Sequence, residues 1–365
     1  MINRVLCIVS NLNQGGAETF LMKLYRNMEP EQYQMDFCIM SEIKGKYEQE
    51  VLSRGGRIFR VVSKSKNPMK CFLQIRKTVK ENGYQSVVRV NEHSLSVIDL
   101  LAAKMGGAKK LVMRSSNANS TSRLSKFLHK LFQILPKTIP DIKIAPSDLA
   151  AEYTFGKKQV KSGKVHFLRN GIQIEQYLYQ PQKREQLRKE MNLENQFVIG
   201  HVGRFSLQKN HKFLIEIFAQ IAKRRPDVKL LLIGQNGNLE EQTRQQVKAL
   251  ALEDKVVFLG NRSDVPDLMS AVDVLLFPSF YEGMPNVVIE AQASGLPCVI
   301  SDTITQEADI TGLVEYLPLS QTDAFWAESV LKYANNFNRN GRKEDFVRAG
   351  YDIADVTRQF IDLVF

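Results

Sequence analysis

The sequence predicts an α/β protein built from two doubly wound parallel-sheet domains. Apolar runs of strand length alternate with longer segments of helical period along most of the 365 residues. The strand-like runs are apolar on both faces, which is typical of parallel strands covered by helices on both sides. A polar, charged stretch at residues 173–196 interrupts this rhythm once, and the alternation then begins again. Because the chain is too long for one ordinary core, we expect two domains joined near residue 170.

The first half of the chain contains six expected strands. In order they read "RVLCIVSN", "MDFCIM", "RIFRVV", "SVVRVN", "KLVMRSS" and "IKIAPS". The segments of helical period between them read "AETFLMKLYRNM", "KYEQEVLSRGG", "PMKCFLQIRKTVKENG", "LSVIDLLAAKMGG" and "TSRLSKFLHKLFQIL". Regular alternation of strand and helix predicts a parallel sheet here.

The second half repeats the pattern. Its expected strands read "FVIGHVG", "VKLLLIG", "VVFLG", "DVLLFPS" and "PCVISD". The expected helices read "NHKFLIEIFAQIAKRR", "LEEQTRQQVKALAL", "VPDLMSAV" and "NVVIEAQASG", and Gly295 ends the last of these. A final segment has helical apolar spacing at Ile353, Val356, Phe360 and Leu363 or Val364. Spacing alone allows this helix to pack simply on the second domain.

Composition indicates a globular protein of a reducing compartment. Hydrophobic residues make up 44% and charged residues 24% of the chain. The cysteines are scattered at positions 7, 38, 71 and 298, so a disulfide framework is not expected. No apolar stretch approaches the roughly 20 residues that span a bilayer, and the N-terminus lacks the features of a signal peptide. We therefore expect a cytoplasmic protein.

The net charge of +11 is concentrated in the first half of the chain. Residues 1–168 carry 28 Lys and Arg against 13 Asp and Glu, whereas residues 169–365 carry 22 against 26. One interpretation is a solvated basic surface that aids solubility. The other is contact with an anionic membrane surface, the phosphates of a lipid carrier or nucleic acid. Nucleic acid is the least favoured, because the sequence shows no helix-turn-helix, zinc spacing or aromatic-rich basic strands.

The first strand-to-helix junction reads "SNLNQGGAETF" and contains Gly15 and Gly16. Two glycines allow close backbone approach, and a helix N-terminus offers free N–H groups and a positive dipole end to an anion. The segment does not match GxGxxG, so a dinucleotide fingerprint is absent. A plain turn is the alternative interpretation.

The corresponding junction of the second domain reads "GHVGRFSLQKNHKFLIEIF" and contains Arg204 and Lys209. Arginine binds phosphate oxygens bidentately and lysine supplies a point charge, so the pair suits a diphosphate. The alternative is that both are solvated loop charges, but their place at a helix entry favours binding.

The segment "FPSFYEGMPNVVIEAQASG" joins an expected strand to its helix and contains Glu282 and Glu290. The loop amides form a candidate anion cradle: those of Gly283, Met284, Asn286 and Val287, but not Pro285, which has no N–H. Glu290 lies four residues after Asn286 and so faces the same side. We expect the cradle to hold a phosphate, Glu290 a ribose and Glu282 a second sugar. The alternative makes both glutamates surface charges.

Neither a metal site nor a hydrolase site is indicated. The sequence has no DxD-like or HExxH spacing at a strand end, so no tightly bound metal or other cofactor is expected. It also lacks the GxSxG motif.

The segment "PSFYEGMPNVVIEAQASGLPCVIS" resembles the Glu-x7-Glu signature of retaining GT-B glycosyltransferases of family four, which assemble bacterial exopolysaccharide and capsule. Further family motifs are matched, in the expected order, by "QGGAE", "LRNGI" (168–172), "VGRFSLQKN" and "GNRSDVPDLMSAVDVLLFPS" (260–279). The resemblance covers essentially the whole chain. It implies the GT-B fold, in which two Rossmann-like domains face a cleft.

The resemblance also implies roles for these residues. Arg204 and Lys209 would bind the diphosphate of a nucleotide-sugar donor and stabilise the leaving group. We expect this donor to be UDP-linked. Glu282 would contact the transferred sugar and Glu290 the ribose. The backbone of Gly283, Met284, Pro285 and Asn286 would lie beside the sugar, and Gly15 and Gly16 would approach the phosphates from across the cleft.

The same resemblance implies a domain plan. Residues 1–168 would form an acceptor domain, residues 169–345 a donor domain, and the helix within 346–365 would cross back to the first domain. A basic acceptor domain suits a lipid-linked or polysaccharide acceptor, with peripheral contact at the inner face of the membrane and no nucleic acid.

One departure from the family pattern concerns a histidine of the first domain. Relatives often carry a segment like His-Ser-His-Asn after the fifth strand, where this chain has Arg114 and Ser116 in "MRSSNANS". His93 is a nearby candidate for the missing role, although a lone histidine is more often a loop residue. The departure leaves open a catalytically silent partner protein. A sugar-nucleotide epimerase is a second rival, because it can share the two-domain architecture.

Overall fold

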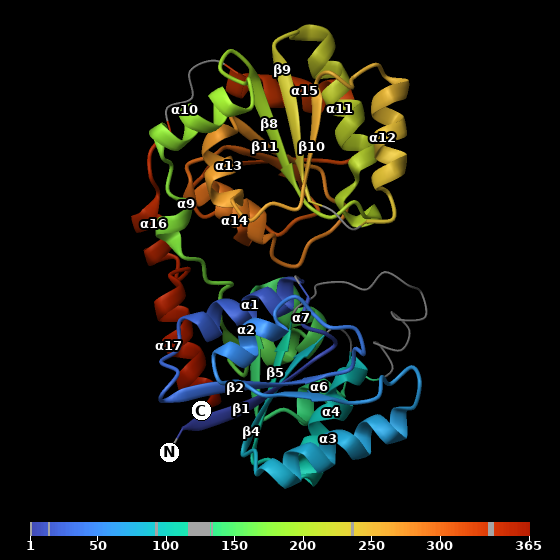
Figure 1. Cartoon of the computed structure of the whole chain (residues 1–365), viewed down its shortest axis with the longest axis vertical. Helices are drawn as coiled ribbons and strands as arrows, with labels where there is room; N and C mark the ends of the chain where they lie inside the picture. Colours follow the sequence, from blue (N-terminus) through green and yellow to red (C-terminus); the bar gives the residue numbers. More distant parts are fainter. Residues whose placement is uncertain are drawn as a thin grey trace. The chain divides into compact units, whose positions relative to one another are not determined.

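The computed structural model describes residues 2–13, 15–91, 94–115, 132, 134–234, 237–334 and 339–365. The chain forms two compact units (Figure 1). Unit 1 comprises Met1–Ile172 and Gly350–Phe365, and unit 2 comprises Gln173–Ala349.

Unit 1 contains a seven-stranded parallel sheet in the order β3-β2-β1-β4-β5-β6-β7. Its strands are β1 (Asn3–Val9), β2 (Tyr33–Ile39), β3 (Ile58–Arg60), β4 (Ser86–Asn91), β5 (Lys110–Ser115), β6 (Ile142–Ala145) and β7 (His166–Phe167). Its helices are α1 (Gly16–Arg26), α2 (Glu48–Ser53), α3 (Pro68–Asn82), η1 (Ser94–Val97), α4 (Ile98–Met105), α6 (Leu135–Thr138), α7 (Asp148–Phe155), α8 (Lys157–Lys161) and α17 (Ile353–Val364).

Strand β1 shows why the strands of unit 1 are apolar on both faces. Val5, Cys7 and Val9 pack into a core with α1, α2 and α17. Leu6 and Ile8 point the other way, into a second core with α3, α4 and α7. Since all five side chains are buried, no face of this strand is left for solvent. The predicted covering of the sheet on both sides is therefore confirmed for unit 1.

Unit 2 contains a six-stranded parallel sheet in the order β10-β9-β8-β11-β12-β13. Its strands are β8 (Phe197–Val202), β9 (Val228–Ile233), β10 (Val256–Gly260), β11 (Val274–Phe277), β12 (Cys298–Ser301) and β13 (Val314–Leu317). Its helices are α9 (Ile174–Tyr177), α10 (Pro181–Glu190), η2 (Leu207–Lys209), α11 (His211–Arg224), α12 (Glu240–Ala249), α13 (Val265–Ala271), α14 (Asn286–Ala293), η3 (Gln306–Ala308), α15 (Asp323–Leu331), η4 (Lys332–Ala334) and α16 (Lys343–Arg348).

The strand order of unit 2 reverses between β8 and β11. In open α/β sheets, ligands bind outside the carboxyl ends of the strands at such a switch point. Figure 1 shows the connections that follow both strands at the same edge of the sheet. The fold thus brings the loop after β8 and the loop after β11 together at the place where a ligand is expected.

The polar stretch at 173–196, which the sequence pattern marked only as a break, contains two helices, α9 and α10. Helix α10 packs against α13, although it is largely polar. Leu187 is buried in an apolar cluster with Leu268 and Ala271 of α13. In addition, Arg184 and Arg188 form ion pairs with the two carboxylate oxygens of Asp273 at 2.5 and 2.6 Å. Apolar periodicity could not reveal a helix held in this way.

The last helix, α17, completes the core of unit 1. Ile353, Val356, Phe360 and Val364 are buried against β1 and α1, and Leu363 is partly buried. The Ser86 hydroxyl donates a hydrogen bond to the Val364 carbonyl at 2.6 Å. The predicted apolar spacing is therefore confirmed, and the helix packs on unit 1 rather than on unit 2.

All four cysteines are buried free thiols. The expectation of no disulfide framework is confirmed. Burial raises the pKa of the Cys7, Cys38 and Cys298 thiols well above the ordinary value, because a thiolate is poorly solvated in the core. They are therefore packing residues rather than nucleophiles.

Candidate functional site

The loops after β8 and β11 are joined by backbone and side-chain hydrogen bonds. The Phe280 amide donates to the Gln208 carbonyl at 2.9 Å, and the Gln208 side chain returns a bond to the Tyr281 carbonyl at 3.0 Å. The Asn210 side chain donates to the Pro278 carbonyl at 3.1 Å. The two loops therefore form one connected edge of unit 2, although more than sixty residues separate them in sequence.

Lys209 and Glu282 meet at this edge. The distance from Lys209 Nζ to Glu282 Oε1 is 2.7 Å, and the two side chains are 17% and 10% exposed. The Lys209 ammonium also lies 4.4 Å from the centre of the Phe277 ring, within cation–π range. The sequence predicted that both residues face one ligand but did not predict their ion pair. Arg204 lies earlier in the same loop, and it is exposed.

Two histidines that sequence reasoning missed lie behind Lys209. His201 on β8 and His211 at the start of α11 are buried, with ring centres 4.8 Å apart. His201 Nδ1 bonds to the Leu276 carbonyl at 2.9 Å. His211 stacks on Phe205 at 4.5 Å, and neither of its ring nitrogens has a partner in the described part of the chain.

Both histidines are held in the neutral form. Burial and, to a smaller extent, the nearby Lys209 charge together lower the pKa of His211 to about 4. Burial also lowers the pKa of His201 well below its usual value, with contributions from His211 and Lys209. They act as flat aromatic packing beneath a cationic side chain. In the sequence, His201 lies inside a run that reads as a buried strand, and no motif marks it as part of a site.

Helix α14 begins at Asn286, immediately after the Gly283–Met284–Pro285 turn. Pro285 is the N-cap, and its side chain has no oxygen with which to cap the helix amides. Its carbonyl accepts from the Val288 and Ile289 amides at 3.0 and 3.2 Å. The predicted strand, turn and helix are confirmed, and the positive end of the α14 dipole closely follows Glu282, the partner of Lys209, along the chain.

Glu290 lies one turn into α14, where it accepts a hydrogen bond from the Tyr177 hydroxyl. Burial and the Glu290 carboxylate together raise the pKa of Tyr177, so the phenol stays protonated and donates. Tyr177 belongs to α9, more than one hundred residues away in sequence. No spacing rule connects these two residues, so the sequence gives no sign that Tyr177 belongs to the site.

Gly15 and Gly16 lie at the start of α1 in unit 1, with Gly15 as the N-cap. A Cβ at Gly15 would lie 2.3 Å from a Glu18 carboxylate oxygen, whereas a Cβ at Gly16 would meet no described atom within 4 Å. Packing inside unit 1 therefore gives no reason for glycine at position 16.

Arg114 occupies the position of the family histidine and is fully buried at the end of β5. Its guanidinium donates to Asn170 Oδ1 at 2.5 Å and lies 3.7 Å from the centre of the Phe20 ring. Burial lowers the pKa of Arg114 to about 9. The residue thus joins β5, α1 and the "LRNGI" loop. Ser116 and His93 lie outside the described residues.

Among the described residues, no three His, Cys, Asp or Glu side chains gather as metal ligands would. The sequence-based expectation of a reaction without a bound metal stays a prediction.

Comparison with known proteins gives consistent matches. A family model described as "Glycosyl transferases group 1" matches residues 182–313, which include Arg204, Lys209, Glu282 and Glu290. The chain is 36% identical over 363 residues to the "Putative glycosyltransferase EpsF" of Bacillus subtilis (strain 168), covering 96% of this chain and 93% of that one.

A second relative is the "UDP-Gal:alpha-D-GlcNAc-diphosphoundecaprenol alpha-1,3-galactosyltransferase" of Escherichia coli. It is 27% identical over 240 residues, covering 64% of this chain and 62% of that one. Among solved structures, Anabaena Alr3699/HepE in complex with UDP and glucose superposes with a TM-score of 0.79 over 99% of both chains, at 18% identity. At that identity the structural likeness concerns the fold alone.

Proposed function

Because the chain belongs to the group 1 glycosyltransferases and has the GT-B fold, we propose that it moves a hexosyl or N-acetylhexosaminyl group from a UDP-sugar to a lipid-linked or polysaccharide acceptor. The observation that carries this proposal is the Lys209–Glu282 ion pair beside the start of α14. The cation and the helix N-terminus suit the diphosphate of a nucleotide-sugar, and carboxylates suit its hydroxyl-bearing sugars.

The donor diphosphate would be held by charge. Arg204 and Lys209 supply two cations, and the turn at Gly283, Met284, Pro285 and Asn286 brings the α14 dipole to the same side. A role of Gly16 beside the phosphates stays a prediction from the family resemblance. Negative charge grows on the diphosphate as the glycosidic bond breaks, so these groups would stabilise the transition state.

The two carboxylates would bind sugars. Glu290, oriented by Tyr177, would accept hydrogen bonds from ribose hydroxyls, and Glu282 would contact the sugar being transferred. Binding of the diphosphate would draw Lys209 toward phosphate oxygens, which leaves the Glu282 carboxylate available to sugar hydroxyls. We propose transfer with retention, through front-face attack in which the departing phosphate helps to deprotonate the acceptor.

The acceptor would bind to unit 1. The relative from Escherichia coli carries a diphosphoundecaprenol acceptor in its name, and the Bacillus subtilis relative is named EpsF. The excess of basic residues in 1–168 supports a diphosphate-bearing lipid acceptor and peripheral contact with an anionic membrane surface. In the described part of the chain, no helix is long and apolar enough to cross a membrane.

The test is a panel of nucleotide-sugars incubated with the purified protein and with undecaprenyl-diphosphate sugars, with release of nucleotide and transfer of sugar both measured. We expect transfer from one UDP-sugar, abolished by Glu282→Ala and by Lys209→Ala. Tight nucleotide binding without turnover on any acceptor would instead indicate a silent partner protein. Interconversion of the UDP-sugar without an acceptor would indicate an epimerase.

A further inference from the structure

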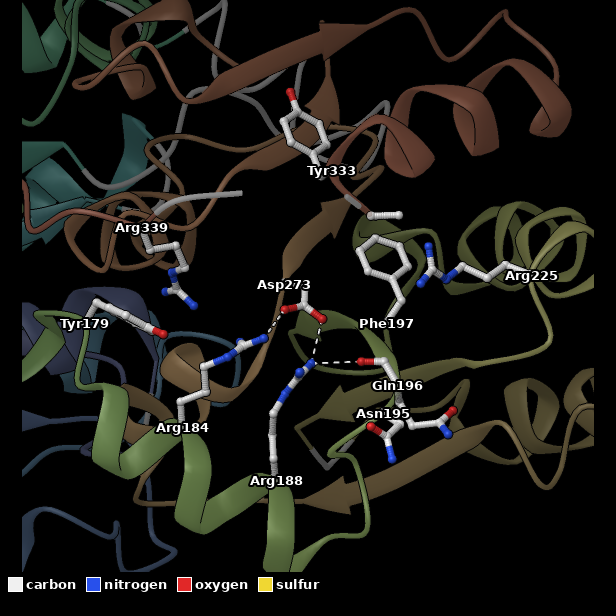
Figure 2. A pocket seen from close by; sticks show the side chains of 11 residues that line it. Tyr179, Arg184, Arg188, Asn195, Gln196, Phe197, Arg225, Asp273, Tyr333 and Arg339 are labelled. Atoms are coloured by element: carbon white, nitrogen blue, oxygen red, sulfur yellow. Dashed lines mark hydrogen bonds and ion pairs between the residues drawn. The ribbon is translucent and has the colours of Figure 1, made fainter. Parts of the chain in front are cut away.

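Unit 2 contains a cavity of about 300 Å³ at the amino-terminal edge of its sheet (Figure 2). Phe197, the first residue of β8, and Asp273, immediately before β11, line it. Lys209 and Glu282 follow the carboxyl ends of these same two strands. The cavity and the proposed donor site therefore lie at opposite edges of one sheet.

Four arginines line this cavity: Arg184, Arg188, Arg225 and Arg339. Figure 2 shows Arg184 and Arg188 reaching Asp273 from α10, while Arg225 and Arg339 approach from opposite sides. Asp273 is the one carboxylate among the lining residues, and Asp227 pairs with Arg225 nearby at 2.9 Å. Even with both carboxylates counted, the cluster retains two positive charges.

Two of the arginines are occupied with the backbone. Arg339 donates to the Met269 and Val272 carbonyls at 2.9 Å and to Ser294, and Arg184 donates to the Ser270 carbonyl at 3.1 Å. These carbonyls belong to the end of α13 and the residues that follow helices, where partial negative charge gathers. These bonds account for Arg184 and Arg339.

Arg188 and Arg225 retain unused donors. Arg188 uses Nε and Nη2 on Ala271, Gln196 and Asp273, which leaves Nη1 without a bond among the described residues. Arg225 bonds to Asp227 through Nη2 alone, and its buried Nε has no partner in the described part of the chain. The Arg225 Nε is buried, so it is costly unless an acceptor meets it.

The charge excess affects the pKa values in the cluster. Burial and the neighbouring Arg184 lower the pKa of Arg339 to about 10, and burial lowers the pKa of Arg188 as well. A bound anion would raise the pKa of both arginines, since it supplies the opposite charge inside the cavity.

We propose that this cavity binds the phosphate group of a small phosphate-bearing anion. Guanidinium N–H groups bind phosphate oxygens strongly, and Arg188 and Arg225 offer free N–H donors on two sides of the cavity. A water molecule occupies about 30 Å³ of liquid, so the cavity has room for a phosphate together with a small organic group. The site is separate from the donor site and is not needed to bind the nucleotide-sugar.

The experiment measures binding of inorganic diphosphate by calorimetry at fixed ionic strength to the full-length Lys209→Ala protein, whose donor site is weakened. Arg225→Gln is then added to that protein. The matched control is Arg224→Gln, which removes the same charge from the adjacent residue, whose partner Glu328 is 66% exposed. Thermal melting without ligand checks that each variant is folded.

We expect Arg225→Gln to weaken diphosphate binding at least tenfold and Arg224→Gln to change it less than twofold. Equal affinities of the two variants, or no binding to either, would overturn the proposal. Orthophosphate, glucose 1-phosphate and UMP are titrated in parallel. Equal affinity for all three shows that the phosphate alone is recognised, and preference for one identifies its organic group.

Discussion

Lys209 Nζ lies 2.7 Å from Glu282 Oε1, so two residues with different proposed roles are joined in one ion pair. Lys209 is assigned to the diphosphate and Glu282 to the transferred sugar. Each fixes the position of the other, with the Phe277 ring beneath the ammonium. The proposed reaction therefore depends on the pair as a unit.

The first prediction concerns this coupling. Lys209→Met and Glu282→Gln are each expected to lower kcat/KM about 100-fold or more, since each removes a charge that acts on the transition state. The double variant should lose little more than the worse single variant, because the second change acts on a pair that is already broken. Steady-state transfer rates of the four proteins measure this.

Lys212→Met is the control for the first prediction, because Lys212 is exposed on α11, three residues from Lys209. It should retain more than half of the wild-type kcat/KM. Strict multiplication of the two single effects in the double variant would show that the residues act independently.

The second prediction concerns Tyr177. Removing the hydroxyl in Tyr177→Phe leaves Glu290 without the donor that orients it, so the donor KM should rise about 5- to 20-fold with a small change in kcat. Initial rates over a range of donor concentration separate the two parameters. Tyr179→Phe, two residues away, should leave both unchanged. A fall in kcat at constant KM would contradict the ribose-binding role of Glu290.

The third prediction concerns acid stability. The folded-state pKa of His211 is lowered to about 4 from an unfolded value of about 6.5. The unfolded chain therefore binds more protons between these values, so stability is complete above pH 6.5 and falls as the pH drops toward 4. In His211→Phe, the loss of unfolding free energy between pH 7 and pH 5 should be smaller by roughly 2 kcal/mol.

Urea unfolding at the two pH values measures this difference. His201 is buried in the same way and keeps part of the acid sensitivity. His166→Gln, at an exposed position on β7, should follow the wild type. If the loss of unfolding free energy between pH 7 and pH 5 is the same in His211→Phe as in the wild type, the folded-state pKa of His211 is not lowered.

The fourth prediction concerns α17. Phe360 is fully buried in the core of unit 1, so Phe360→Ala should reduce the free energy of unfolding by about 3–5 kcal/mol. The exposed neighbour Gln359→Ala should change it by less than about 0.5 kcal/mol. Equal denaturation midpoints for the two variants would show that α17 contributes little to the core.

The sequence was sufficient where local chemistry decides the structure. Buried strands such as β1 are apolar on both faces, and Gly295 adopts a φ of +65° just after α14, which favours the glycine predicted to end that helix. The candidate site residues also lie at strand-to-helix junctions, because parallel strands place all of these junctions at one edge.

Contacts between residues that are distant in the sequence could not be predicted from its pattern. The pairing of Lys209 with Glu282, the contact of Tyr177 with Glu290 and the histidine pair arise only when the sheet brings separate loops together. Helix α10 was missed for a different reason. It is held by Leu187 and by arginines that bind Asp273, so no apolar stripe marked it.

The return of the chain to unit 1 has a consequence for the order of folding during synthesis. Unit 2 is one continuous segment, Gln173–Ala349, whereas the core of unit 1 needs Phe360 and Val364 from the last helix. Domains generally fold as units when their residues have left the ribosome. Unit 1 is therefore completed only after unit 2, because its core stays unfinished until α17 has been synthesised.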